Sequence, residues 1–201
     1  MRLPSSRFLE LIIAASVVVI SLASLFVALY QGRVMERTMK ASVLPVVEYT
    51  TGNYDIDLDE PRITMTLSNN GLGPATIKQV LFRYEGVEFT SPGHLLALCC
   101  VPGADNVEEA QAILRTAAFP VITSVLRNRV LTPGQTLPML SMPDQDLGEL
   151  GAGVWAELDT ARFDVEVEVC YCSVFDDCWR TRYPDAVRTP VERCIRREDQ
   201  E

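Results

Sequence analysis

An uncharged apolar run near the start of the chain constrains the fold more than any other feature. Leu11 to Tyr30 read LIIAASVVVISLASLFVALY, twenty residues without a charged side chain. At about 1.5 Å of rise per residue, a helix of this length spans roughly 30 Å, the thickness of the hydrocarbon core of a bilayer. The sequence therefore predicts a transmembrane helix over residues 8–30, with the ring of Tyr30 at the interface.

Two other structures compete for this run, a buried core helix and a cleaved signal peptide. Core helices rarely remain apolar on all faces over such a length. Signal peptides have a shorter apolar region, about 7–15 residues, that ends at a small-x-small cleavage site, whereas this run ends in Val27-Ala28-Leu29-Tyr30. An uncleaved, single-pass signal anchor fits best, and the lipid bilayer is the expected partner of residues 8–30.

The flanking charges leave the orientation of this helix nearly undecided. Two arginines lie in the N-terminal flank, residues 1–7, and three basic residues follow the run within residues 31–40. The positive-inside rule then favours a cytoplasmic C-terminal side only slightly. Within the run, Ser24 and Ala28 have the small-xxx-small spacing that lets helices approach closely. We expect at most a weak self-association through this pair.

The residues after the membrane segment change character twice. Residues 31–42 contain Glu36 and Lys40 at i,i+4 spacing, which predicts a helical stalk that ends before Pro45. Residues 43–194 contain short alternating segments with Gly/Pro turns between them, and residues 195–201 form a charged tail. The alternation predicts strands, in these segments: 62–67, 77–84, 135–140, 163–172 and 178–183.

These features predict a mainly β fold: an N-terminal transmembrane helix followed by an antiparallel, immunoglobulin-like β-sandwich. One short helical insertion interrupts it, over residues 105–116. Asp105 is the expected N-cap of that helix, with Glu108 three residues later as its capping-box partner.

Charge and motif content exclude several classes of function. Residues 1–40 have five basic and two acidic side chains, while the remainder has a net charge of −12. A domain this acidic repels phosphate backbones, so no nucleic-acid partner is expected. The single histidine, His94, follows a Pro-Gly pair and is interpreted as a loop residue. Because a third glycine is missing after Gly71 and Gly73, no dinucleotide site is predicted, and we expect no cofactor.

The acidic triplet Asp55, Asp57 and Asp59 has the spacing at which a calcium loop begins. An EF-hand also needs glycine at its sixth position and glutamate at its twelfth, and this chain has Glu60 and Thr66 there. A solvated loop is therefore the preferred interpretation, and neither calcium nor another metal is expected.

Three of the six cysteines lie within residues 170–178. Cys170 and Cys172 follow a run of alternating valines and share a strand face with Glu166 and Glu168, which predicts a polar surrounding. A hairpin loop centred on Phe175 sets Cys172 opposite Cys178, at a cross-strand distance that suits a disulfide. Cys170 then requires Cys194, Cys99 or Cys100 as its partner.

Free thiols and a zinc site of Cys170, Cys172, Cys178 and Cys194 remain alternatives to disulfides. The spacing C-x-C-x5-C-x15-C lacks the paired C-x2-C units of strong zinc motifs, and no C-x-x-C redox motif is present. Disulfides persist in oxidising compartments. This interpretation therefore places the domain outside the cytoplasm and decides the orientation of the helix.

Three short motifs are present: Asn70 to Ala75 (NGLGPA), Leu131 to Gly134 (LTPG) and Cys170 to Ser173 (CYCS), with Cys178-Trp179. In these motifs the chain resembles a group of uncharacterised bacterial proteins with a single-pass membrane anchor and a β-sandwich. The resemblance implies this architecture and a location in the bacterial inner membrane, with the domain in the periplasm. It gives no information about activity.

The sequence thus leads us to expect a non-catalytic envelope module with interaction or structural roles and an unidentified membrane or envelope protein as its partner. Two alternatives stay open. One is a membrane-tethered thiol or metal-dependent enzyme that uses the cysteines between Cys170 and Cys178, and the other is an accessory subunit of a larger membrane complex.

Overall fold

The computed structural model describes residues 6–117 and 120–194, and the chain forms two compact units, Met1–Ser42 and Val43–Glu201. We describe each unit by itself. Most of the predicted flank 1–7 and the whole charged tail 195–201 lie outside the described residues.

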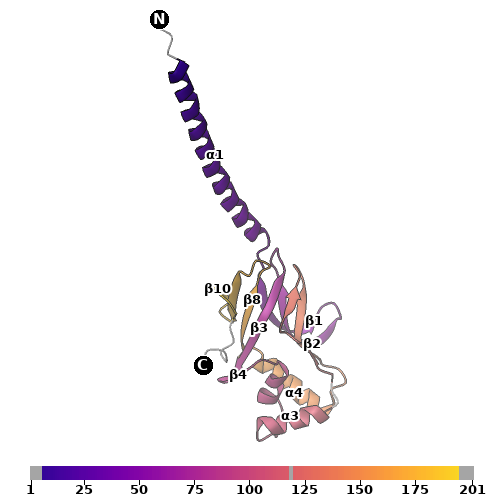
Figure 1. The fold of residues 1–201 in the computed structure, drawn as a ribbon. Helices are drawn as coiled ribbons and strands as arrows, with labels where there is room; N and C mark the ends of the chain where they lie inside the picture. Colours follow the sequence, from indigo (N-terminus) through magenta and orange to yellow (C-terminus); the bar gives the residue numbers. More distant parts are fainter. Residues whose placement is uncertain (1–5, 118–119, 195–201) are drawn as a thin grey trace. The chain divides into compact units, whose positions relative to one another are not determined.

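The first unit contains one continuous helix, α1 (Ser6–Ser42) (Figure 1). Its large apolar side chains from Leu9 to Tyr30 are all exposed, so nothing in the unit buries them. Of the helices in the described ranges, only α1 is long and apolar enough to cross a membrane. Residues 31–42 continue the same helix, in which Lys40 and Glu36 form an ion pair at 3.7 Å.

The second unit is rich in β structure and contains two antiparallel sheets (Figure 1). The first sheet has the order β1-β2-β7-β5, with the bounds β1 (Val47–Asp55), β2 (Glu60–Asn69), β7 (Thr136–Pro143) and β5 (Ile122–Thr123). The second sheet has the order β10-β9-β8-β3-β4, and β6 also pairs with β3. Its bounds are β10 (Val187–Val191), β9 (Cys178–Tyr183), β8 (Glu166–Cys172), β3 (Ala75–Tyr84), β4 (Val87–Phe89) and β6 (Arg129–Leu131). The prediction of an antiparallel, sheet-rich chain with one long apolar N-terminal helix is confirmed.

Alternation of apolar and polar side chains explains why these segments are strands. In β2, Ile63, Met65 and Leu67 are fully buried, and the residues between them are half-buried. In β8, Val167 and Val169 are buried in the same manner. Because successive side chains of a strand point to opposite faces, one face of each strand enters the interior. Both sheets contribute to one buried apolar cluster.

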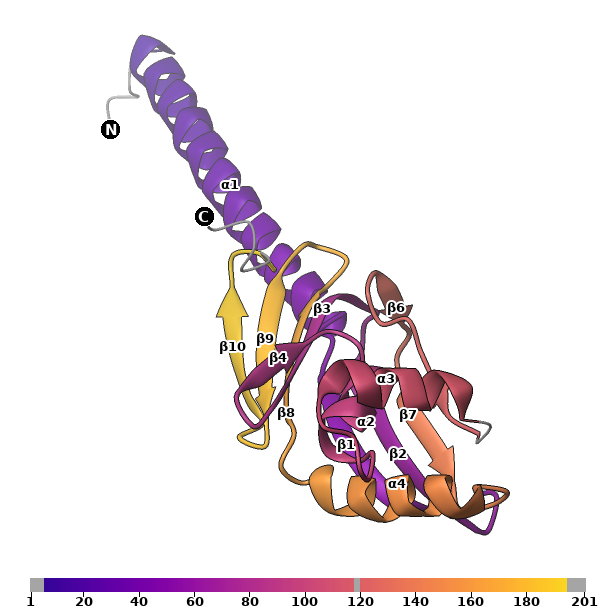
Figure 2. The same cartoon turned by 90° about the horizontal axis from the view of Figure 1, so that it is seen from below.

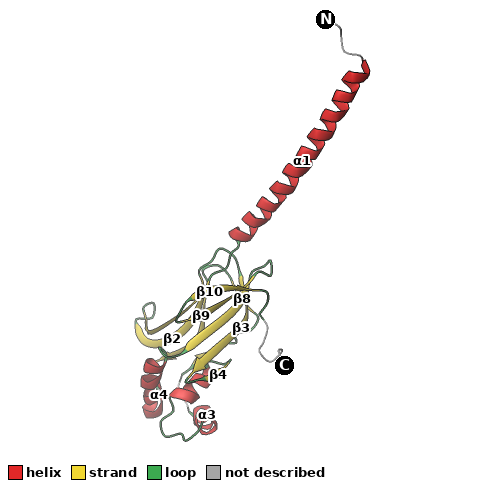
Figure 3. Ribbon diagram, turned by 90° about the vertical axis from the view of Figure 1, so that its left-hand side faces the viewer, coloured by secondary structure: helices red, strands yellow, loops and turns green. Residues whose placement is uncertain are grey.

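Three helices belong to the second unit where the sequence predicted one: α2 (Gly93–Cys99), α3 (Val107–Thr116) and α4 (Gly148–Ala161). They gather at one end of the sheets (Figures 2 and 3). The prediction of a single helical insertion is therefore wrong. Glycines at 148, 151 and 153 lower the helix propensity of α4, and α2 is a short apolar run after a Pro-Gly pair. Burial of Val154 and Leu158 stabilises α4 in spite of its glycines.

Helix α3 begins at Val107, two residues after the start of the predicted range 105–116, and Asn106 rather than Asp105 caps it. The side chain of Asn106 accepts a hydrogen bond from the backbone N–H of Glu109 at 2.9 Å. The Glu109 carboxylate in turn accepts one from the N–H of Asp105 at 3.0 Å. The capping residues are thus shifted by one position from the predicted pair, and the Glu109 carboxylate binds the residue before the cap rather than the cap itself.

The strand predicted over residues 163–172 is shorter in the structure and begins at Glu166. Helix α4 ends at Ala161, and Phe163 and Asp164 turn the chain into β8. The ring of Phe163 is exposed instead of buried, with the Arg162 guanidinium 4.0 Å from its centroid. An apolar residue in this short connection followed the alternating pattern of the strand by coincidence.

Candidate functional site

The hairpin of β8 and β9 positions the first pair of cysteines. Its register places Cys172 directly opposite Cys178, with Cα atoms 4.0 Å apart, and a disulfide joins them. The loop between them is closed by a hydrogen bond from the N–H of Ser173 to the carbonyl of Asp177, at 2.8 Å. Asp176 adopts a left-handed conformation, φ 58°, which short polar residues tolerate best after glycine.

A second disulfide joins Cys170 to Cys194, whose Cα atoms are 5.7 Å apart. Cys194 follows β10 and is the last described residue. The chain therefore returns to β8 after leaving the sheet edge, and the bridge fixes it there.

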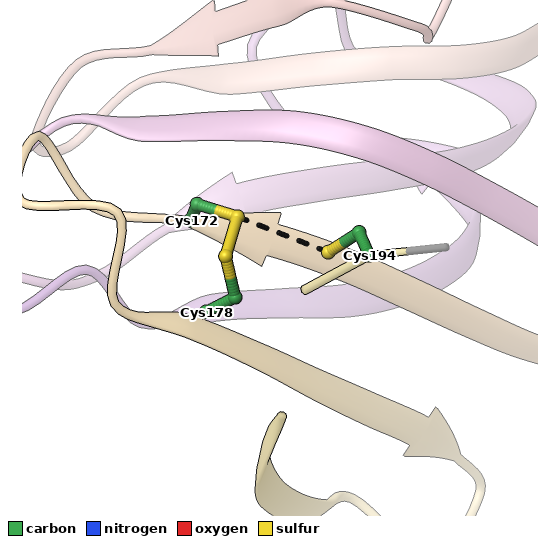
Figure 4. A group of neighbouring side chains, drawn as sticks. All are labelled: Cys172, Cys178 and Cys194. Carbon is green, nitrogen blue, oxygen red and sulfur yellow. Dashed lines mark hydrogen bonds between the residues drawn. A yellow bond between two sulfur atoms is a disulfide. The ribbon is translucent and has the colours of Figure 1, made fainter. Parts of the chain in front are cut away.

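The bridge between Cys172 and Cys178 lies beside the sulfur of Cys194 (Figure 4). The sulfur atoms of Cys172 and Cys194 are 3.9 Å apart. Those of Cys172, Cys178 and Cys194 all lie within 4.8 Å of one another. We call these three residues and Cys170 the cysteine cluster. With both bridges formed, its sulfurs are not thiolates; after reduction, three of them could serve as ligands of one soft metal ion.

The surroundings of the cysteine cluster differ from the polar face that the sequence predicted. Cys170 and Cys172 are only 2% and 3% exposed, and Cys178 is also buried. The bridge to Cys194 brings a further segment onto this face of β8, which alternation within a strand cannot reveal. This prediction of a polar setting is wrong for the cysteines and holds only for the first half of β8.

Ion pairs occupy that first half of the same face. Arg83 of β3 binds Glu166 at 2.7 Å and also Glu88. These hydrogen bonds, to Glu88 first and Glu166 second, raise the pKa of Arg83. Glu168 accepts from Arg182 at 2.9 Å and lies 3.2 Å from Arg180. The carboxylates of β8 therefore serve cross-strand pairing.

The remaining candidate residues lie elsewhere in the unit. Cys99 and Cys100, neighbours in sequence at the end of α2, are bonded to each other rather than to Cys170. His94 is exposed on α2, and its ring meets Phe89 edge-on at 6.5 Å. It belongs to a helix, not to the loop that the sequence predicted. Asp55 accepts hydrogen bonds from the backbone N–H groups of Asp57 and Leu58, so the acidic triplet closes a turn.

A second polar cluster surrounds Asn69, at the end of β2. Its carboxamide is fully buried and uses all four hydrogen-bonding positions. The oxygen accepts from the backbone N–H groups of Val46 (3.2 Å) and Gly71 (3.1 Å). The nitrogen donates to the carbonyls of Gly73 (2.8 Å) and Leu131 (2.9 Å). One side chain thus links the NGLGPA turn, the LTPG turn and the first residues after α1.

The glycines of the NGLGPA turn are required by the close approach of residues 43–46. A Cβ atom on Gly71 would collide with the backbone of Val46, and one on Gly73 with the backbone of Val43. The backbone also pairs here: the N–H of Leu72 donates to the carbonyl of Leu44 at 2.9 Å. We call residues 43–47 the junction segment. The sequence predicts a turn here but not its packing partner, because residues 43–46 are distant from the turn along the chain.

Two further contacts hold the junction segment from the other sheet. The hydroxyl of Tyr183 donates to the carbonyl of Val47 at 3.0 Å, and Arg188 donates to the carbonyl of Pro45 at 3.5 Å. Burial is the main cause that raises the pKa of Tyr183 to about 12, and burial likewise raises that of Tyr49 to about 12. The two rings lie 5.6 Å apart.

Comparison with known proteins returned no match: no family model, no curated protein and no solved structure is similar to this chain. The resemblance drawn from the short motifs therefore rests on those residues alone.

Proposed function

We propose that this protein is a membrane-anchored, non-catalytic module with an interaction or structural role in a bacterial envelope. In this proposal residues 8–30 cross the inner membrane once as a signal anchor. Residues 43–194 form an immunoglobulin-like sandwich in the periplasm, where they bind an unidentified membrane or envelope protein.

The observation that carries the proposal is the fixation of the junction segment. Helix α1 ends at Ser42, and the residues that follow are held by Asn69, Leu72, Tyr183 and Arg188. No flexible Gly/Ser-rich linker separates the apolar helix from the folded domain. The domain is therefore folded from the first residues after the apolar helix, as the proposed membrane-anchored module requires.

The cysteine bridges support the proposed compartment. Two of them lie between residues distant by 6 and 24 positions, and all described cysteines are paired. Disulfides of this kind persist in oxidising compartments such as the periplasm.

A protease-accessibility experiment tests the topology. Spheroplasts that contain the full chain are treated with protease, with a cytoplasmic protein as the control for membrane integrity. We expect digestion of the domain and survival of a fragment that contains residues 8–30. A domain that is digested only after lysis of the spheroplasts contradicts the periplasmic assignment.

The alternative of a thiol or metal-dependent enzyme is supported by one observation, the approach of three sulfurs within 4.8 Å. Thiol titration under denaturing conditions, with and without reductant, separates the two proposals. The non-catalytic module predicts thiols only after reduction. Free thiols or bound zinc in unreduced protein favour the enzyme.

The third proposal, an accessory subunit of a larger complex, predicts one specific partner that co-purifies in mild detergent. A weak self-association through Ser24 and Ala28 predicts instead a cross-linked homodimer that the substitution Ala28→Ile abolishes, because a large side chain separates the two helices.

A further inference from the structure

Two short strands cover the edge of β3 that faces away from β8, with a gap between them. β4 pairs with residues 82–84 and β6 with residues 75–77, and both run antiparallel to β3. They are therefore two parts of one interrupted edge strand. Within the described ranges, no strand pairs with residues 78–81 on this edge. At about 3.3 Å per residue the gap is roughly 13 Å long.

A groove of about 440 Å³ lies at this gap. Its walls come from residues 78–80 of β3, residues 90–92 after β4, residues 123–127 before β6, and Cys194. The volume falls in the range of small-molecule sites, roughly 300–1,000 Å³. The chain itself borders the groove at two places, after β4 and before β6. An extended peptide would have to continue past these borders, so a compact ligand fits the groove better.

The charge of the groove is opposite to that of the rest of the domain. Among the described residues that line the groove, Lys78 and Arg127 are charged and none has a carboxylate. Both are exposed, and neither forms an ion pair with another residue that the structure describes. Residues 41–201 nevertheless have 25 acidic and 13 basic side chains. Two cations with no carboxylate in the described lining are therefore an unusual local excess in this domain.

The rest of the lining combines hydroxyl groups with apolar side chains. Thr90, Ser91 and Thr123 supply hydroxyls, while Val80 and Leu126, each 5% exposed, supply apolar surface. Ammonium, guanidinium and hydroxyl groups all donate hydrogen bonds to a carboxylate, and the charged donors form the stronger bonds. The apolar surface suits a small hydrocarbon body.

We propose that this groove is a binding site for a small organic carboxylate. Lys78 and Arg127 bind the acid group, and the hydrocarbon part packs on Val80 and Leu126. The site goes beyond the proposed anchoring role, since it assigns a soluble ligand to a face of the domain that the junction segment does not use.

Binding of benzoate tests the proposal, with benzamide as an uncharged probe of nearly the same shape. The full chain is placed in nanodiscs of phosphatidylcholine, and binding is followed by calorimetry and by NMR saturation transfer. We expect a dissociation constant for benzoate that is roughly millimolar, as befits so small a ligand, and at least about fivefold weaker binding of benzamide. Benzoate affinity should fall with added salt.

Variants assign the binding to the groove. Lys78→Gln and Arg127→Gln should each weaken benzoate binding about fivefold, since each removes a charged donor. Arg115→Gln, at an exposed cation of α3 outside the groove, should leave it unchanged. All three positions are exposed, so circular dichroism and the unfolding midpoint should match those of the wild type.

Three results would overturn the proposal. They are no binding at a benzoate concentration 50-fold above the expected dissociation constant of about 1 mM, equal binding of benzoate and benzamide, and benzoate binding that neither groove variant weakens. None of these results bears on the protease experiment above, so the site and the membrane topology fail or succeed separately.

Discussion

The carboxamide oxygen of Asn69 accepts a hydrogen bond from the backbone N–H of Val46, at 3.2 Å, across 23 residues of sequence. The NGLGPA turn connects β2 of the first sheet to β3 of the second. Through this bond it holds the segment that follows α1. The same side chain donates to Leu131, so it also fixes the turn before β7. A single buried amide thus determines how the chain enters the domain.

Asn69→Ala should therefore lower the free energy of unfolding by about 3 kcal/mol. It removes four hydrogen bonds of roughly 1 kcal/mol each and leaves buried backbone groups without partners, while water replaces part of what is lost. Urea denaturation of the full chain in detergent, followed by tryptophan fluorescence, measures the change.

The neighbouring Asn70→Ala is the control for this variant. Asn70 is exposed, and among the described residues its side chain binds the Glu48 carboxylate alone. Its loss should cost less than about 1 kcal/mol, as for other exposed polar pairs. Equal effects of the two substitutions would mean that the Asn69 carboxamide does not hold the junction segment.

Gly73→Ala should lower the stability of the domain more than the same substitution of a glycine in a helix or strand usually does. The new Cβ atom meets the backbone of Val43, which cannot move away as a flexible side chain can. We expect a loss of at least about 2 kcal/mol, measured as a lower urea midpoint. Gly52→Ala is the matched control, because the nearest atom to its Cβ would be the Thr64 hydroxyl at 3.8 Å. A harmless Gly73→Ala contradicts the close approach of the two segments.

The alternation of apolar and polar residues predicted those strands in which one face is buried. β2, β3, β7 and β9 overlap their predicted segments, because alternation in each follows burial on one face. Helix α4 escaped prediction because tertiary burial of Val154 and Leu158, not propensity, stabilises a glycine-rich helix. β1 and β10 lack a regular apolar alternation: only Val47 of the nine residues of β1 is buried, and four of the five residues of β10 are exposed.

Features that join distant segments could be predicted only in part. A hairpin centred on Phe175 was enough to set Cys172 opposite Cys178, because the two cysteines belong to one local unit. The role of Asn69 depends on residues 23 and 62 positions away, so no local signal identifies it. The groove at residues 78–81 arises from a gap between β4 and β6, which the sequence did not predict as strands.

The two bridges of the cysteine cluster should contribute unequally to stability. A disulfide stabilises chiefly by restricting the unfolded chain, and the effect grows with the length of the closed loop. The loop from Cys170 to Cys194 is longer than that from Cys172 to Cys178, with separations of 24 and 6 residues. The entropy relation gives about 3.4 kcal/mol for the longer loop and about 2.2 kcal/mol for the shorter one.

Double serine variants measure this difference. The pair Cys170→Ser and Cys194→Ser should have a lower free energy of unfolding than the pair Cys172→Ser and Cys178→Ser, by about 1 kcal/mol. Peptide mapping without reductant establishes the pairing beforehand. The reverse order of stability would show that the hairpin bridge does more than close a loop. Identical numbers of free thiols before and after reduction would show that the protein contains neither bridge.

The buried tyrosines should make the domain sensitive to alkaline pH. Burial, the largest cause, raises the pKa of Tyr49 and of Tyr183 to about 12 from an ordinary value of 10. Between these values the unfolded chain loses phenolic protons that the folded domain retains, so stability falls as pH rises. Each tyrosine contributes at most about 1.4 kcal/mol per pH unit. Below about pH 10 neither group makes stability depend on pH.

Phenylalanine variants separate the two tyrosines. The hydroxyl of Tyr49 has no hydrogen-bond partner among the described residues, whereas that of Tyr183 donates to Val47. Tyr49→Phe should therefore leave stability at pH 7 unchanged or slightly raised, and Tyr183→Phe should lower it by about 1 kcal/mol. Both should flatten the decline between pH 10 and 12, because each removes one titrating group. Urea titrations at pH 7, 10 and 11.5 measure these effects. A decline as steep in both variants as in the wild type would assign the alkaline sensitivity to other groups.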